Sequence, residues 1–202
     1  MAIGILYRRM EFAFPPVSEP SWHALVDRWY QLDAPAYGLC EAVMHWKGEW
    51  KVPDRMIFAS PGASNVSDLD FVRSGTTSPA KFVHTLPNVR ASALAQVMEW
   101  NGPTVCLQRD PMTFLSALVQ AGEWIGVDCP VAWVVGVFSN KEVHHWELHR
   151  ARTWERYPFW LGNDDGMEEN DDGKLLDWLG HSDDGLTKRF RLPYGYFLAR
   201  NV

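Results

Sequence analysis

The apolar positions of the chain recur with two different spacings, and each change of spacing marks a boundary between a helix and a strand. Large apolar residues fall at helical intervals over 21–46, with an interruption at Pro35, and Ser21 is a residue type that caps a first helical turn. The short apolar run 55–60 ends at a Pro-Gly breaker and predicts a buried strand. A short helix is expected over 66–73.

The middle of the chain repeats this alternation. Helical spacing returns over 78–100 and stops at an Asn-Gly-Pro sequence, after which the branched and apolar residues of 104–108 predict a strand. Asp110 and Pro111 suit the cap and first turn of a further helix. The run 131–138 is apolar without alternation, so it predicts a central strand that is covered on both faces.

This order of elements predicts a layered α/β domain. Towards the C-terminus the pattern weakens, because 141–160 has no clean period and 163–173 is an acidic tract typical of an exposed loop. Alternating apolar residues over 188–201 indicate a terminal strand or hairpin. We expect a single domain over 1–202, with 141–202 forming a C-terminal extension.

Composition and charge exclude several classes of function. The 202 residues carry a net charge of -6 and no basic stripe, so we do not expect a nucleic-acid partner. No apolar run reaches the length of a membrane span, and the short run before Arg8 and Arg9 does not resemble a secretion signal, so we expect a cytoplasmic protein. The 3 cysteines are widely separated and fit neither a disulfide framework nor a metal clamp.

A family resemblance is carried by residues 78–124, SPAKFVHTLPNVRASALAQVMEWNGPTVCLQRDPMTFLSALVQAGEW. The turn at Asn88, the helix after it and the Gly102-Pro103 pair resemble the part of β-ketoacyl synthases that leads to the nucleophile elbow. The upstream sequence RMIFASPGA stands where that family has the strand before its first long helix. Over 36–140 the chain is similar to shortened, stand-alone ketosynthase-like N-terminal domains of bacterial polyketide and aryl-polyene pathways. The resemblance implies a layered α-β-α, thiolase-like half-domain with a mixed sheet.

The catalytic residues of the family are not matched. Counting without gaps from Gly102 puts Pro111 at the position of the family's nucleophilic cysteine, and proline cannot be a nucleophile. The nearest thiol, Cys106, lies inside the predicted strand, where a small buried residue is ordinary. The two histidines that complete the family's chemistry belong to a C-terminal half that these residues do not include. We therefore expect no condensing activity from this chain on its own.

The resemblance implies an accessory subunit comparable to a chain-length factor. It would form a heterodimer with a full-length β-ketoacyl synthase in polyketide, aryl-polyene or fatty-acid-like biosynthesis and shape the acyl pocket of that synthase, with an acyl carrier protein as a second candidate partner. In thiolase-type pairs the interface runs through the strand before the elbow, which here comprises Thr104, Val105, Cys106, Leu107 and Gln108. Met112 and Phe114, at the start of the next helix, are the expected acyl-pocket residues.

Two other functions stay open at this point. One is an acyl-carrier-dependent acyltransferase that uses Cys106 with one of the histidines, and the other is a carrier-protein docking or scaffold module. No Gly-rich phosphate-binding motif or hydrolase elbow is present in the sequence. We expect no cofactor.

The clustered histidines and acidic residues are less specific indications of a functional site. His144, His145 and His149 invite a metal site, but no further ligand falls at a diagnostic spacing, so a solvated or interface cluster is favoured. The acidic tract lacks the terminal carboxylate of a calcium loop. His84 and Asp70 could form an acid–base pair only if the fold brings them together. No metal is expected.

Overall fold

The computed structural model describes residues 3–60, 65–75, 86–108, 112–138, 141–150, 159–162, 187–192 and 195–200. The helices within these ranges are two short 3-10 turns, η1 (His23–Leu25) and η2 (Trp29–Gln31), and the α-helices α1 (Ala34–His45), α2 (Asn65–Ser74), α4 (Pro87–Val97) and α5 (Thr113–Trp124). The strands are β1 (Ile3–Glu11), β2 (Arg55–Ala59), β3 (Thr104–Leu107), β4 (Val131–Phe138), β5 (Glu142–Arg150), β6 (Phe159–Gly162), β7 (Thr187–Leu192) and β8 (Gly195–Arg200).

The strands form one mixed sheet in the order β3-β2-β4-β5-β1-β6-β8-β7. β2 pairs in parallel with both β3 and β4, whereas β4, β5 and β1 pair antiparallel. The C-terminal strands join the sheet at a single register position, Ile3 opposite Phe159, and β7 and β8 form the expected terminal hairpin. The predicted mixed sheet is therefore confirmed, with β3 at one end of it.

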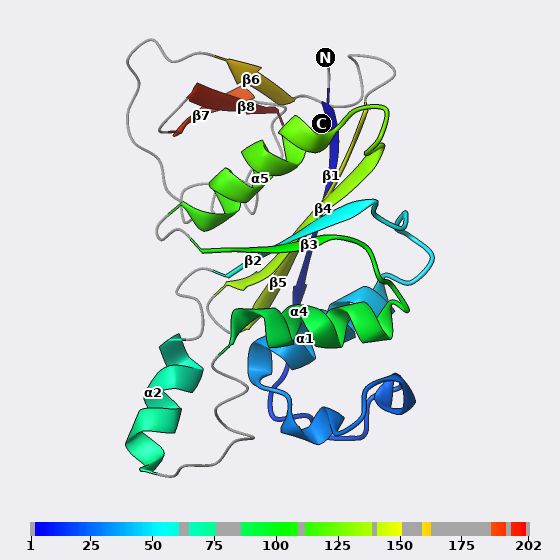
Figure 1. Ribbon diagram of the computed structural model, residues 1–202, viewed down its shortest axis with the longest axis vertical. Helices are drawn as coiled ribbons and strands as arrows, with labels where there is room; N and C mark the ends of the chain where they lie inside the picture. Colours follow the sequence, from blue (N-terminus) through cyan, green and yellow to red (C-terminus); the bar gives the residue numbers. More distant parts are fainter. Residues whose placement is uncertain are drawn as a thin grey trace.

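Helices cover both faces of the central strands. Figure 1 shows α5 on one side of the sheet and α1 with α4 on the other. Successive side chains of β2 point to opposite faces of the sheet, as the pleat of a strand requires. Met56 and Phe58 pack into the core with α1 and α4, and Ile57 and Ala59 pack into the core with α5. This is the layered α-β-α arrangement that the resemblance implied.

β4 is the covered central strand that its apolar run predicted. Residues 132–137 are all buried, with Trp133 and Val135 on the α1 side and Val134 on the α5 side. A Cβ at Gly136 would lie 2.0 Å from the carbonyl oxygen of Ala59, so the glycine permits close approach of β2 and β4 at this point. No helix within the described ranges is long and apolar enough to cross a membrane.

The first long helix begins later than the pattern of 21–46 suggested. The residues before Asp33 form the two short 3-10 turns, so a cap at Ser21 is wrong. Asp33 caps α1 instead, because its side chain accepts a hydrogen bond from the backbone N–H of Ala36 at 3.0 Å. Pro35 lies in the first turn, where its missing N–H costs no helical hydrogen bond, and so it starts the helix rather than interrupting it.

Two strands were missed because they bury polar side chains. β1 and β5 pair along their whole lengths, from Ile3 opposite Arg150 to Glu11 opposite Glu142. Their arginine, histidine and glutamate residues obscure the strand period in the sequence. β5 consequently belongs to the centre of the sheet and not to a C-terminal extension. The acidic tract 163–173 lies outside the described residues.

Gly136 provides a test of the packing between β2, β4 and α5. Substitution Gly136→Ala places a methyl group against the backbone of Ala59 and 2.8 Å from the ring of Phe114. We expect the free energy of unfolding to fall by about 1–3 kcal/mol or more, as in other overpacked cores. Gly126→Ala is the matched control, since the nearest atom to its added Cβ is 3.9 Å away. Equal stability of the two variants in urea titrations would contradict this packing.

Candidate functional site

The candidate interface strand β3 lies at the end of the sheet. It pairs with β2 on one side, and its other side meets no strand among the described residues. Thr104, Val105, Cys106 and Gln108 are exposed, and Leu107 is partly buried against the core beneath α5. An edge of this kind offers unpaired backbone groups to another chain.

The hydrogen bonds to β2 show which backbone groups are unpaired. The N–H of Met56 donates to the carbonyl of Pro103 at 3.1 Å, and the N–H of Ser60 donates to the carbonyl of Leu107 at 3.0 Å. In a parallel ladder, alternate residues of a strand face the same neighbour. Val105 and Leu107 therefore direct their backbone groups towards β2. The N–H and carbonyl groups of Thr104, Cys106 and Gln108 face the open edge.

Cys106 is poorly suited to act as a nucleophile. Partial desolvation raises the pKa of its thiol above the ordinary value, which disfavours the reactive thiolate. The histidines of β5 are separated from β3 by β2 and β4, which at ordinary strand spacing is about 14 Å. The described residues thus bring none of the three β5 histidines to this thiol.

Met112 and Phe114 both lie at the start of α5, on the core side of the helix. Met112 is partly buried against the core, and Phe114 is 0% exposed. The Phe114 ring lies 5.7 Å from the ring of His144 and 5.0 Å from that of Trp146, measured between centroids. Phe114 is therefore a core residue by its packing. Both predicted acyl-pocket residues thus lie at the N-cap and in the first turn of α5. Pro111 lies outside the described residues.

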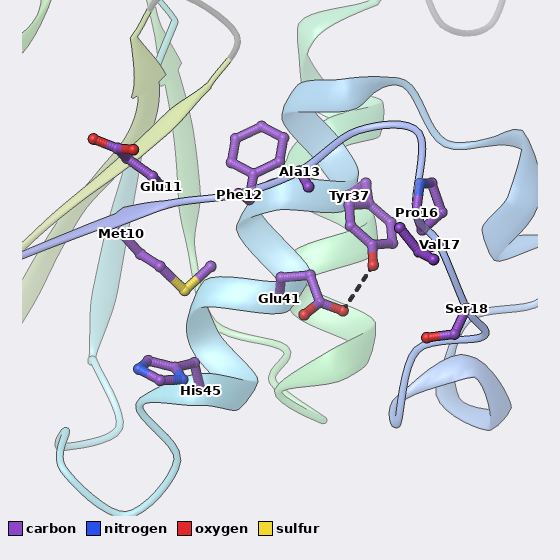
Figure 2. A pocket seen from close by; sticks show the side chains of 10 residues that line it. All are labelled: Met10, Glu11, Phe12, Ala13, Pro16, Val17, Ser18, Tyr37, Glu41 and His45. Carbon is purple, nitrogen blue, oxygen red and sulfur yellow. Dashed lines mark hydrogen bonds between the residues drawn. The ribbon is translucent and has the colours of Figure 1, made fainter.

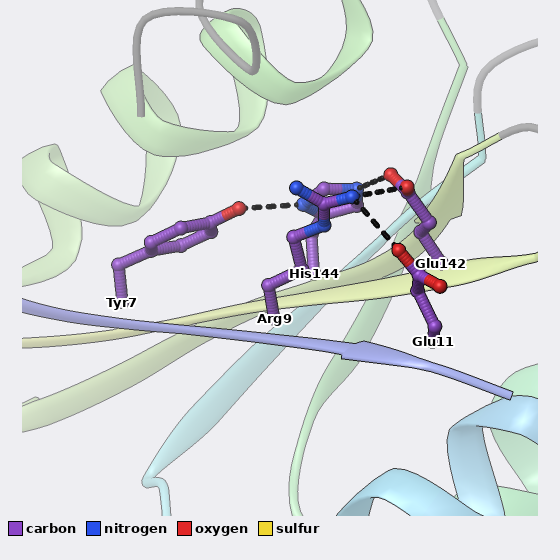
Figure 3. Close-up of polar contacts among 5 residues, drawn as sticks. All are labelled: Tyr7, Arg9, Glu11, Glu142 and His144. Atoms are coloured by element: carbon purple, nitrogen blue, oxygen red, sulfur yellow. Dashed lines mark hydrogen bonds and ion pairs between the residues drawn. The ribbon is translucent and has the colours of Figure 1, made fainter. Parts of the chain in front are cut away.

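Beneath α5, a polar network joins β1 to β5 (Figure 3). Tyr7 Oη forms a hydrogen bond with His144 Nδ1 at 2.8 Å. His144 Nε2 lies 3.5 Å from a carboxylate oxygen of Glu142, longer than a good hydrogen bond. Arg9 contacts the carboxylates of both Glu142 and Glu11. Burial raises the pKa of the Tyr7 hydroxyl, so Tyr7 keeps its proton.

A second network lies on the opposite face of the same strands. His145 packs edge-on against Trp133, with 4.4 Å between the ring centroids, and Arg8 Nη1 lies 3.4 Å from its Nδ1. Arg8 Nη1 also lies 3.7 Å from the buried carboxylate of Glu147. That carboxylate accepts a hydrogen bond from the backbone N–H of Lys51 at 3.1 Å, which ties the loop after α1 to the sheet.

The prediction of a solvated or interface histidine cluster is wrong. His144 and His145 are buried, and the strand pleat places them on opposite faces of the sheet. No group of metal-ligating side chains occurs in the described part of the chain. Sequence reasoning missed Tyr7, Arg8 and Glu147, because neither β1 nor β5 has a clean alternation of polar and apolar residues that would mark it as a strand. His84 lies outside the described ranges.

Comparisons with known proteins identify the fold. No known family matches the sequence, and no curated protein does. Among solved structures, the chain is similar to one chain of the complex that the ketosynthase ApeO forms with its chain length factor ApeC, from Xenorhabdus doucetiae. The two chains superpose with a TM-score of 0.68 at 11% sequence identity, over 99% of this chain and 100% of that one. The protein therefore has a ketosynthase-like α/β fold, as the resemblance of residues 78–124 implied.

The two buried histidines predict a loss of stability in acid. Burial, aided by Arg9 for His144 and by Arg8 for His145, lowers the pKa of each to about 3. An unfolded histidine binds a proton below about pH 6.5, so the unfolded state is favoured increasingly as the pH falls from there towards 3. Below about pH 6, each of the two histidines should lower the free energy of unfolding by about 1.4 kcal/mol for every unit by which the pH falls.

Urea unfolding at a series of pH values from neutral to about pH 5 checks this expectation. His144→Gln removes one of these imidazoles and should reduce the slope by the share of one histidine, while His149, whose pKa is also lowered by burial, still titrates. A free energy of unfolding that does not change over this range would show that the two imidazoles are not buried in neutral form.

Proposed function

We propose that this chain is a noncatalytic, chain-length-factor-like subunit that pairs with a full-length β-ketoacyl synthase in the cytoplasm and shapes its acyl pocket. The pathway would be of the polyketide, aryl-polyene or fatty-acid type. The fold similarity supports the proposal, because the structure to which the chain is similar is a complex of a ketosynthase with its chain length factor.

The open edge of β3 is the observation that carries the proposal. Backbone groups of Thr104, Cys106 and Gln108 face outwards in a row, and Val105 is 42% exposed beside them. Addition of a strand from another chain would satisfy this row, and main-chain hydrogen bonds of this kind supply affinity in many complexes. A ketosynthase with a similar edge strand would continue the sheet from one subunit into the other.

The acyltransferase alternative receives less support from the same residues. A nucleophilic cysteine needs a lowered pKa or a neighbouring base. The pKa of the Cys106 thiol is raised, and the histidines of β5 are separated from β3 by the two strands β2 and β4. The properties of β3 fit pairing better than they fit catalysis.

The start of α5 would contribute to the pocket of the pair. Met112 is only partly buried, and a methionine side chain adapts readily to an acyl chain. Phe114 is fully buried against the rings of His144 and Trp146 and would hold the start of the helix in place. Met112 is therefore the side chain that would meet the acyl chain, while Phe114 fixes the start of α5.

The edge-strand proposal predicts the effect of a proline in β3. Cys106→Pro removes an outward-facing N–H and adds a ring at the open edge, while the hydrogen bonds of Val105 and Leu107 to β2 stay available. We expect a folded protein that no longer co-purifies with a co-expressed ketosynthase. Size-exclusion chromatography and a melting curve provide the measurement.

Cys106→Ser is the matched control for this experiment. It removes the thiol but keeps the N–H, so it should retain the partner. If Cys106→Pro is folded and still binds the ketosynthase, the interface lies elsewhere. If Cys106→Ser abolishes an acyl transfer activity, the acyltransferase alternative replaces the proposal.

The acyl-pocket proposal predicts a change in product length. Met112→Ala should lengthen the products of the reconstituted pair and cost less stability than truncation of a fully buried residue. Phe114→Ala should cost about 3–5 kcal/mol. Leu118→Ala, a buried residue farther along α5, is a control that should lower stability without changing the products. Unchanged products from a stable complex that carries Met112→Ala would remove α5 from the pocket.

A further inference from the structure

A cavity of about 390 Å³ lies between α1 and the segment that leaves β1 (Figure 2). Its volume is in the range of small-molecule sites. The lining residues are Met10, Glu11, Phe12, Ala13, Pro16, Val17, Ser18, Tyr37, Glu41 and His45. None of the functions considered above uses this cavity.

One close contact fixes the wall of the cavity. The ring of Phe12 lies so close to α1 that a Cβ at Gly38 would come within 2.4 Å of it. The backbone N–H of Phe12 also donates to the carbonyl of Lys141 at 3.0 Å, which anchors the segment to the turn before β5. The segment is therefore held beside α1 at a defined position, with the cavity between them.

Polar side chains of α1 form one wall of the cavity, with a carboxylate at its centre. Tyr37, Glu41 and His45 follow one face of α1 at intervals of four residues, and Figure 2 shows Glu41 between the other two. Glu41 Oε1 accepts hydrogen bonds from Trp22 Nε1 at 2.9 Å and from Tyr37 Oη at 3.1 Å. These two donors fix the carboxylate. Its other oxygen, Oε2, makes no hydrogen bond to any residue in the described ranges.

The walls around this carboxylate are apolar or aromatic. Met10, Phe12, Pro16 and Val17 supply them, together with the ring of Tyr37. The lining contains no lysine or arginine. The carboxylate of Glu11 pairs with Arg9 in the network of Figure 3, which leaves Glu41 as the carboxylate available to a ligand. A cation with a short hydrocarbon stem matches both features, because the stem can lie against the walls and the aromatic rings also attract a cation.

We propose that this cavity binds an alkylammonium group, with its positive charge at Glu41 and its hydrocarbon stem against Phe12 and Tyr37. The group can come from a free organic amine or from a lysine side chain of another protein. The site involves β1 and α1, whereas β3 lies at the opposite end of the five central strands. The inference is thus independent of the pairing proposed for β3.

Titration of the isotope-labelled protein with butylammonium chloride, followed by NMR, tests the site. We expect saturable shifts of the Trp22 indole N–H, which donates to Glu41, with a Kd on the order of 1 mM. The uncharged analogue 1-butanol should produce no comparable shift. High salt should weaken the binding of butylammonium in the unmodified protein, because it screens the attraction.

Glu41→Gln separates charge from structure. The amide oxygen can still accept from Trp22 and Tyr37, so the fold should persist, but we expect butylammonium to bind at least about tenfold more weakly. Glu123→Gln, an exposed acid on α5, is the control and should bind like the unmodified protein. Equal binding of Glu41→Gln, equal binding of 1-butanol, or no saturable shift in the unmodified protein would overturn the proposal.

A second probe distinguishes the two sources of the amine. Nα-acetyl-lysine methylamide presents the same ammonium group on a peptide backbone. Binding as strong as that of butylammonium supports a lysine side chain of a protein partner as the ligand. Binding of butylammonium alone supports a free amine, and either result upholds the alkylammonium site.

Discussion

Burial of β2 and β4 on both faces is the constraint on which the rest of the structure depends. Residues 56–59 and 132–137 are almost entirely shielded from solvent, which requires helices on the two sides of the sheet. α5 covers one side and α1 with α4 the other. The strand β3 lies beyond β2, at the end of the sheet. Its exposure is therefore a consequence of the way the centre is built.

The antiparallel strand β5 buries polar side chains, whereas the buried residues of the parallel strand β2 are apolar. Glu147 is buried, yet its carboxylate has the N–H of Lys51 and the guanidinium of Arg8 nearby. Burying an ionised group without such partners would be costly. His144 and His145 avoid the same cost by remaining neutral, since burial lowers the pKa of each. Several of these groups contact one another across the two strands, as Tyr7 does with His144 and Arg8 with Glu147.

The sequence predicted those parts of the fold in which burial and residue type agree. β2, β3 and β4 are runs of branched or apolar residues, and each was found within a residue or two of its expected position. β1 and β5 could not be found in this way, because Arg8, His145 and Glu147 are polar residues whose burial depends on one another. The same holds for the cavity at Glu41, since Trp22 and Phe12 reach it only through tertiary packing.

For the candidate site, the sequence located the strand and helix but not their surroundings. Residues 104–108 were predicted as a strand and Thr104–Leu107 form it, but its position at the end of the sheet follows only from the pairing of β2 with β4. Phe114 was predicted to face an acyl pocket, and whether it lines one or supports one depends on the rings of His144 and Trp146 packed against it. Residue type alone does not distinguish a core aromatic from a pocket aromatic.

Hydrogen exchange of the β3 amides, with and without the co-expressed ketosynthase, tests the central claim most directly. The N–H of Cys106 faces the open edge and should exchange rapidly in the isolated chain, whereas the amides of Val105 and Leu107 face β2 and serve as internal references. Strand pairing across the interface predicts that protection of the Cys106 amide rises strongly in the complex. A complex that forms while the Cys106 amide exchanges as before would contradict the account.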